Sequence, residues 1–269
     1  MSNVVVTHAP SGLVHAHVLR RAAVTPHLVR VTIGGDDLRR FEYRGFDQWF
    51  RLAVPVRDTH PRFDNLPDRF DMGGYLRYLA LPKHTRPVIR NYTVRGFRPD
   101  GAHGPELDID FVVHGADGIA APWAASAEAG DEVAFIDQGC GWRGETAEPV
   151  LLIGDESALP AVAGILRDLP RDVTGTAIIE LFDAADRQEI EGPAGVDVLW
   201  VTRSPDDAPG TEALAVLRDL VSIPADVTAF AAGESGLATG ARRHLVGERG
   251  IPKSQVTFCG YWKAGKAAG

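Results

Sequence analysis

The segment RNYTVR at positions 90–95 places a cation, an aromatic ring and a hydroxyl close together. If it forms an extended strand, Arg90 and Tyr92 point to one face and Thr93 to the other, because strand side chains alternate. A flavin nucleotide needs a cation for its phosphates, a ring against its isoalloxazine and a small polar group near its reactive nitrogen. The segment could therefore bind a flavin; the alternative is an exposed strand with ordinary cross-strand pairs.

The segment LLIGDESALPA at positions 151–161 joins a strand-like apolar run to a helix-like pattern. In dinucleotide-binding domains this turn usually carries glycines, because phosphate sits on bare backbone N–H groups. Here the acids Asp155 and Glu156 occupy the turn. Asp155 or Ser157 can cap the helix, and carboxylates favour its positive end. The turn is therefore a poor predicted site for a pyrophosphate.

The first half of the chain is rich in β-strand patterns. Short runs of alternating or apolar residues are separated by Gly, Pro and Asp, which is typical of an antiparallel barrel or sandwich. The predicted strands lie within 14–35, 49–56, 88–97 and 106–115. Residues 57–75 are polar and contain Pro and Gly, so we expect a long loop there, and residues 121–129 predict a helix.

The second half alternates strands with helices, which predicts a parallel sheet with right-handed crossovers. Its apolar strands suit a sheet that is buried on both faces. The predicted strands lie at 150–155, 175–184, 196–204, 227–234 and 255–262, and the helices at 157–170, 211–221 and 237–250. The pattern changes near residues 140–149, so we divide the chain into domains at 1–145 and 146–269.

Composition excludes several classes of function. The 269 residues carry a formal net charge of −8, which argues against nucleic acid as the main partner. Cys140 and Cys259 form neither a CxxC motif nor a metal-ligand spacing, which favours a reducing compartment over a disulfide framework. The chain shows no apolar run of membrane-spanning length and no signal peptide at its start. We therefore expect a soluble cytoplasmic protein with no bound metal and no membrane partner.

A family resemblance follows from these motifs and others taken together. RNYTVR resembles the RxY(T/S) flavin signature of ferredoxin-reductase-like enzymes. Over residues 12–265 the chain resembles the siderophore-interacting proteins, which are FAD-dependent ferric-siderophore reductases; GDESALPA and the terminal GYWKAG carry this resemblance most specifically. It implies an N-terminal antiparallel six-stranded FAD-binding β-barrel and a C-terminal parallel α/β domain of the NAD(P)H-binding type. It also implies reduction of a chelated Fe(III) to Fe(II) with electrons from NAD(P)H.

The resemblance also implies which residues contact FAD. The segment around 114–123 matches the part that relatives place at the pyrophosphate and adenosine, so the flavin phosphates are expected in the first domain. The chain departs from relatives by reading GIAAPWA where they often read GPA(S/A)xWA, and by its 137–145 loop. For the tryptophans, packing in the core is the alternative. The implied residues are Arg90, Tyr92, Thr93, Val94, His114, Gly115, Gly118, Ala120, Ala121, Trp123, Asp155, Ser157, Tyr261 and Trp262.

The substrate side needs positive charge rather than an acid–base pair. A ferric siderophore holds Fe(III) in hard oxygen donors and is often anionic, and its reduction requires approach to the flavin edge without covalent attack. We therefore assign no catalytic side chain. The candidate substrate contacts are Arg51, Arg143 and Lys263, each of which could instead be a solvated surface cation.

Two features of the sequence give opposing predictions for the electron donor. Thr202 and Arg203 end a strand where related enzymes often read the 2′-phosphate of NADPH with a hydroxyl and an arginine. Asp183 and Asp186 would repel that phosphate and favour NADH. The balance leans slightly to NADPH, which would dock weakly beside the acidic turn.

Three other interpretations stay open. Ferredoxin could supply the electrons, a different acceptor could replace the siderophore, or the chain could bind siderophores without catalysis. The intact flavin segment argues against the last. We expect a monomer.

Overall fold

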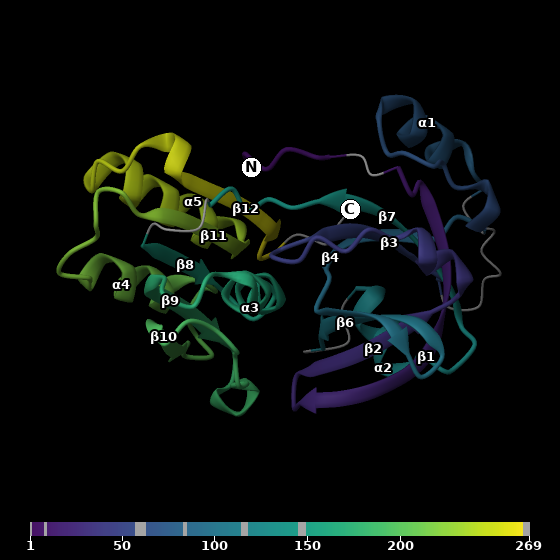
Figure 1. Ribbon diagram of the computed structural model, residues 1–269, viewed down its shortest axis with the longest axis horizontal. Coiled ribbons are helices and arrows are strands. Elements are labelled where there is room, and N and C mark those ends of the chain that lie inside the picture. The colour runs from purple at the N-terminus through teal and green to yellow at the C-terminus, as the bar shows by residue number, and fades with distance from the viewer. Residues whose placement is uncertain are drawn as a thin grey trace. The chain divides into compact units, whose positions relative to one another are not determined.

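The computed structural model describes residues 2–7, 10–56, 63–82, 85–113, 118–144 and 149–265, and the chain forms two compact units (Figure 1). The first unit comprises Val6–Arg44 and Gln48–Gly139. The second comprises Met1–Val5, Gly45–Asp47 and Cys140–Gly269. The chain therefore passes between the units more than once.

The first unit is built on one antiparallel sheet of seven strands in the order β4-β3-β7-β1-β2-β6-β5. The antiparallel fold expected from the sequence is confirmed, with seven strands instead of six. The strands are β1 (Leu13–Thr25), β2 (Leu28–Gly34), β3 (Trp49–Val54), β4 (Val88–Thr93), β5 (Gly96–Gly101), β6 (Gly104–Val112) and β7 (Glu132–Gly139).

Two features were not predicted: β7 lies outside the predicted strand runs, and the run 88–97 divides in two. The backbone N–H of Val94 donates to Gln48 O at 2.8 Å, and that of Arg95 donates to Asp108 O at 2.9 Å. The chain thus leaves the pairing with β3 at Val94 and joins β6 as β5. A continuous apolar pattern in the sequence carries no signal for this change of partner.

The sheet curls around its main apolar core. Tyr92 lies on the edge strand β4 and Phe111 on β6, far apart in the strand order, yet their ring centroids are 4.4 Å apart. Buried residues from β1, β2, β3, β6 and β7 share the same core cluster. This enclosure explains why alternate residues along these strands are apolar.

Short helices complete the first unit: η1 (Asp36–Arg40), η2 (Phe63–Asn65), α1 (Met72–Ala80) and α2 (Ala120–Ser126). The prediction of a loop over 57–75 is wrong at 63–65 and 72–75, where η2 and the start of α1 lie, and holds for 66–71; residues 57–62 lie outside the described residues. Asp71 caps α1, since its carboxylate accepts the N–H of Gly74 at 2.7 Å. An aspartate at this position in the sequence was a signal for the start of a helix that we did not use.

The second unit is a parallel five-stranded sheet in the order β10-β9-β8-β11-β12, as expected from the alternating pattern. Its strands are β8 (Val150–Gly154), β9 (Thr174–Leu181), β10 (Gly195–Thr202), β11 (Thr228–Glu234) and β12 (Val256–Trp262). Its helices are α3 (Leu159–Asp168), α4 (Thr211–Asp219) and α5 (Ser235–Arg243), with short turns η3 (Ala184–Asp186), η4 (His244–Glu248) and η5 (Lys253–Gln255). The strand order reverses between β8 and β11, which is the switch point where open α/β sheets bind ligands.

The helix after β8 packs as its sequence pattern predicts. Leu159, Val162, Ile165, Leu166 and Leu169 are all at most 3% exposed, so the predicted apolar face is confirmed. Within the described ranges, none of the helices combines the length and the apolar character needed to cross a membrane.

A buried carboxylate organises the start of the second unit. Asp47 is 2% exposed and accepts the backbone N–H groups of Gly141 at 3.0 Å and Trp142 at 2.9 Å. Burial raises its pKa to about 6, although those hydrogen bonds oppose the shift.

This raised pKa predicts a pH dependence of stability. Between 3.8, the ordinary pKa, and about 6, the native protein holds a proton that the unfolded chain releases, so the contribution of Asp47 to stability falls as the pH rises through that window. The free energy of unfolding of the unchanged protein minus that of Asp47→Asn should therefore decrease by at most about 3 kcal/mol from about pH 4 to about pH 6. Urea unfolding at several pH values measures it, and a constant difference would contradict the assignment.

Candidate functional site

The strand β4 presents the predicted flavin residues in two different ways. The ring of Tyr92 packs against Phe111, and its burial raises the pKa of the phenol. Arg90 is partly exposed and donates to Ile89 O at 2.8 Å. Thr93 and Val94 are at most 6% exposed. The strand therefore offers a fixed aromatic ring and a guanidinium, whereas the side chains of Thr93 and Val94 belong to the interior.

The second predicted flavin segment continues the same aromatic row. Trp123 meets Phe111 edge to face at 5.6 Å, which links it through that ring to Tyr92. The indole Nε1 of Trp123 is buried and finds no hydrogen-bond partner among the described residues. A buried donor without an acceptor is costly, so an acceptor on a bound ligand would satisfy it.

The backbone next to Trp123 is open. Gly118 adopts φ +86, and no atom of the described residues lies within 4 Å of the position a Cβ would take. Ala120 and Ala121 begin α2, whose first turn receives no side-chain cap within the described part of the chain. His114 and Gly115 lie outside the described residues. The row of rings, the unsatisfied indole N–H and this open backbone fit a flavin nucleotide.

The predicted substrate residue Arg51 lies on the other face of the sheet. It pairs directly with Asn91 across β3 and β4, so it faces away from Arg90 and Tyr92. Its guanidinium lies 5.0 Å from the ring of Phe70 and donates to Phe70 O at 3.3 Å. Burial lowers its pKa.

Arg51 belongs to a row of residues that the sequence analysis missed. The rings of Phe70 and Tyr78 are 5.5 Å apart, and the guanidinium of Arg86 lies 5.4 Å from the Tyr78 ring. The row joins α1 to the outer face of the sheet, where Phe70 and Tyr78 pack on a second apolar cluster. We had expected a loop over 57–75, which includes Phe70, and so did not predict this packing.

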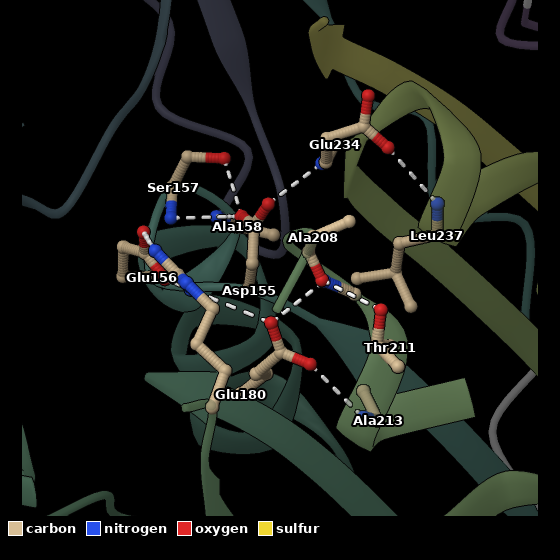
Figure 2. A network of polar contacts seen from close by, with 12 residues as sticks. Asp155, Glu156, Ser157, Ala158, Glu180, Ala208, Thr211, Ala213, Glu234 and Leu237 are labelled. Carbon is tan, nitrogen blue, oxygen red and sulfur yellow. Dashed lines mark hydrogen bonds and ion pairs between the residues drawn. The ribbon is translucent and has the colours of Figure 1, made fainter. Parts of the chain in front are cut away.

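In the second unit, carboxylates lie at the carboxyl ends of the strands around the switch point (Figure 2). Asp155 is fully buried, and its Oδ1 accepts the backbone N–H of Ser157 at 2.9 Å and its hydroxyl at 2.5 Å. Its Oδ2 accepts the N–H of Glu234 at 2.6 Å, which ties the end of β8 to the end of β11. Neither candidate caps α3, whose N-cap is Ala158; Asp155 instead holds the turn before the helix, with Ser157 as a donor to it.

Two further carboxylates accept hydrogen bonds from backbone N–H groups at the starts of the neighbouring helices (Figure 2). Glu180, on β9, accepts the N–H of Gly210 at 2.6 Å and of Ala213 at 3.0 Å at the start of α4. Glu234 accepts the N–H groups of Gly236 and Leu237 at the start of α5. The helix termini that could receive phosphate are thus already bound to the chain's own anions.

The arginine predicted to read a 2′-phosphate is committed elsewhere. The guanidinium of Arg203 makes a bidentate pair with Glu156, at 2.6 and 2.7 Å, and approaches Glu180 at 3.4 Å. Its side chain is 5% exposed. Burial acts against its charge, but these carboxylates raise the pKa of Arg203 overall. Contrary to the sequence-based expectation, Arg203 presents no free guanidinium, while Thr202 beside it is exposed.

The carboxylates of Asp155 and Glu234 also hold the C-terminal aromatic segment. The indole Nε1 of Trp262 donates to Asp155 Oδ2 at 2.9 Å, and Ser235 Oγ donates to Trp262 O at 2.7 Å. Glu234 Oε1 accepts the N–H of Ala264 at 3.2 Å. Burial and the charge of Glu156 raise the pKa of Asp155, against the hydrogen bonds that favour its carboxylate.

The remaining predicted contacts of the second unit are at its surface. Tyr261 is partly exposed and Lys263 is exposed, directly after the held Trp262. Arg143 is exposed and donates to Asn3 O. The structure thus fixes Trp262 by hydrogen bonds, whereas Lys263 extends into solvent.

Comparison with known proteins gives consistent matches over both units. The family model described as the siderophore-interacting FAD-binding domain matches residues 17–141, and the one described as siderophore-interacting protein matches residues 147–265. The ferric vibriobactin reductase ViuB of Vibrio cholerae is 32% identical over 252 residues, covering 92% of this chain and 88% of that protein.

Two further proteins extend the comparison. The NADPH-dependent ferric-chelate reductase of Escherichia coli is 28% identical over 256 residues, covering 92% of this chain and 91% of its own. The crystal structure of a siderophore utilization protein from T. fusca superposes with a TM-score of 0.79 at 32% identity, covering 97% of both chains. The whole described fold therefore has a solved counterpart.

The hydrogen bonds of Asp155 predict a marked difference between two substitutions. Asp155→Ala removes the acceptor of three backbone N–H groups, of the Ser157 hydroxyl and of the Trp262 indole, so we expect a loss of about 2–4 kcal/mol in the free energy of unfolding. Ser157→Ala removes only a donor hydroxyl and should cost about 1 kcal/mol or less. Urea unfolding compares them, and equal losses would show that Asp155 does not organise this edge.

Proposed function

The chain belongs to the siderophore-interacting protein family, and we propose that it is an FAD-dependent oxidoreductase that reduces the Fe(III) of a ferric siderophore to Fe(II). The observation that carries the proposal is the row of Tyr92, Phe111 and Trp123 beside Arg90, with its unsatisfied buried indole N–H. The relatives named as a ferric vibriobactin reductase and a ferric-chelate reductase support the same chemistry.

The chain's role in this reaction is to bind and orient. When bound, FAD supplies the ability to take up a hydride from a nicotinamide donor and release single electrons to iron. Arg90 offers charge to the flavin phosphates, and Tyr92 is a rigid ring because its packing on Phe111 fixes its orientation. Trp123 offers its indole N–H, and the backbone at Gly118, Ala120 and Ala121 offers close approach.

Recognition of the chelate needs charge near the flavin but no proton transfer. Lys263 and Arg143 are exposed cations of the second unit, and Arg51 is a half-buried cation of the first. We propose Lys263 and Arg143 as contacts for an anionic chelate, because local positive charge can attract an anion even on an acidic protein. Arg51 faces away from Arg90 and Tyr92 in its own sheet, so it is not included. No residue is assigned as general acid or base.

The electrons come from NADH or NADPH in this proposal, with reduced ferredoxin as the alternative source. The carboxylates at the switch point leave few N–H groups for a dinucleotide, which supports brief rather than tight donor binding. Cys140 and Cys259 form no disulfide among the described residues, which supports a reducing compartment such as the cytoplasm.

The flavin assignment predicts a selective effect of one arginine. Arg90→Ala should weaken FAD binding about tenfold or more, because a charge-assisted contact to phosphate is lost. Arg21→Ala is the matched control, since Arg21 is an exposed arginine on β1 of the same unit. Fluorescence titration of the FAD-free proteins with FAD measures the dissociation constants of both variants. Equal affinities would show that Arg90 does not contact FAD.

The activity is tested with one purified preparation and several donors. The FAD-loaded protein is mixed anaerobically with a ferric siderophore and an Fe(II) chelator, in parallel with NADH, NADPH and reduced ferredoxin. We expect Fe(II) to form with at least one donor. Turnover of quinones or free flavin without any reduction of ferric chelates would assign a different acceptor, and a protein that binds no FAD would overturn the proposal.

A further inference from the structure

We propose that this protein discriminates against the 2′-phosphate of NADPH, and that Glu156 is the positioning residue that sets this preference by sequestering Arg203. The inference rests on the proposed function, because it concerns the nicotinamide donor of that reaction. It reverses the slight preference for NADPH that the sequence motif alone suggested.

The first support is the state of Arg203. Reading a 2′-phosphate requires a guanidinium with N–H groups directed at the ligand. Both terminal nitrogens of Arg203 are instead bound to Glu156, at 2.6 and 2.7 Å, and one also faces Glu180 at 3.4 Å. The side chains of these carboxylates are at most 3% exposed, so the pair is shielded from solvent.

The net charge of this cluster is the second support. Glu156 and Glu180 carry two negative charges against the single positive charge of Arg203, so the buried group is anionic overall. The ring of Phe182 also packs on Arg203, with its centroid 5.4 Å from the guanidinium carbon. A phosphate dianion would therefore meet repulsion in place of a partner.

The end of β9 supplies the third support. In dinucleotide-binding folds an acid at the end of the second strand accepts the ribose 2′-hydroxyl and excludes a 2′-phosphate. Asp183 lies two residues after the end of β9, is partly exposed, and accepts the N–H of Ala185 at 2.9 Å. We therefore assign its carboxylate as the acceptor of the ribose 2′-hydroxyl of NADH.

Helix termini do not compensate for these charges. The N–H groups at the starts of α4 and α5 are bound to Glu180 and Glu234, and those after β8 are bound to Asp155. Each of these sites would otherwise attract phosphate. The extra dianion of NADPH therefore finds no replacement partner at these positions.

The unchanged protein gives the first test. With FAD-loaded protein and a ferric siderophore, kcat/KM should be about tenfold or more higher for NADH than for NADPH. Isothermal calorimetry should show tighter binding of AMP than of adenosine 2′,5′-bisphosphate, a readout that needs no turnover. Equal or reversed preferences would overturn the inference, as would the absence of binding by either nucleotide.

Two variants test the role of Glu156. Glu156→Gln weakens the hold on Arg203 and should shift the NADH-to-NADPH ratio toward NADPH by about fivefold or more. Glu191→Gln is the matched control, because Glu191 is an exposed glutamate paired with Arg171 and should leave the ratio unchanged. Arg203→Gln should cause no selective loss with NADPH, whereas a selective loss would show that Arg203 reads the 2′-phosphate after all.

These outcomes separate the two proposals. Failure of every donor to drive Fe(III) reduction would overturn the proposed function, while the calorimetric comparison of the two nucleotides would still decide the inference. Should Glu156→Gln not fold, as judged by circular dichroism, the unchanged protein and Arg203→Gln still give a decisive answer.

Discussion

The second unit depends on one buried carboxylate, that of Asp155, at the point where the strand order of its parallel sheet reverses. Through its two oxygens Asp155 joins the turn after β8, the end of β11 and the indole of Trp262 on β12. A buried carboxylate is stable only where hydrogen-bond donors surround it, and here backbone, hydroxyl and indole donors do so. The acidic turn is therefore a structural junction built at the place where other folds hold a phosphate.

This junction separates the duties of the two units. Because chain carboxylates occupy the N–H groups of the second unit's sheet edge, tight binding of a nucleotide is better supported in the first unit, where a ring row and an unsatisfied indole N–H are present. A resident flavin and a transient donor are what an oxidoreductase of this family requires. Glu180 is one of these carboxylates and also approaches Arg203 at 3.4 Å, so the proposed choice of donor is linked to the anchoring of the strand ends.

Local sequence patterns predicted the elements but not their long-range partners. The parallel sheet and the buried face of α3 followed from periodicity, because burial on one side imposes a regular spacing. The division between β4 and β5 did not, since it depends on the carbonyls of Gln48 and Asp108. The helix α1 was missed because its polar, Pro- and Gly-containing lead-in resembles a loop.

The same limit applied to the site. RNYTVR indicated Arg90 and Tyr92 because a strand places them on one face, but nothing in the motif showed that Arg51 would face the other way. Arg203 looked like a phosphate ligand, since its partners Glu156 and Glu180 are 47 and 23 residues away in the sequence. Residue spacing in the sequence does not reveal ion pairs between distant residues. The pairing of Arg203 with these glutamates is why we no longer propose it as a phosphate ligand.

The central claim, that a flavin held by this chain passes electrons to chelated iron, is tested most directly by a single turnover without any donor present. The FAD-loaded protein is reduced chemically, freed of reductant and mixed anaerobically with excess ferric siderophore while flavin absorbance and Fe(II) are followed together. The account predicts return of the oxidised flavin spectrum with about two Fe(II) formed per flavin, since a fully reduced flavin carries two electrons. Flavin that stays reduced in the presence of the ferric chelate would contradict it.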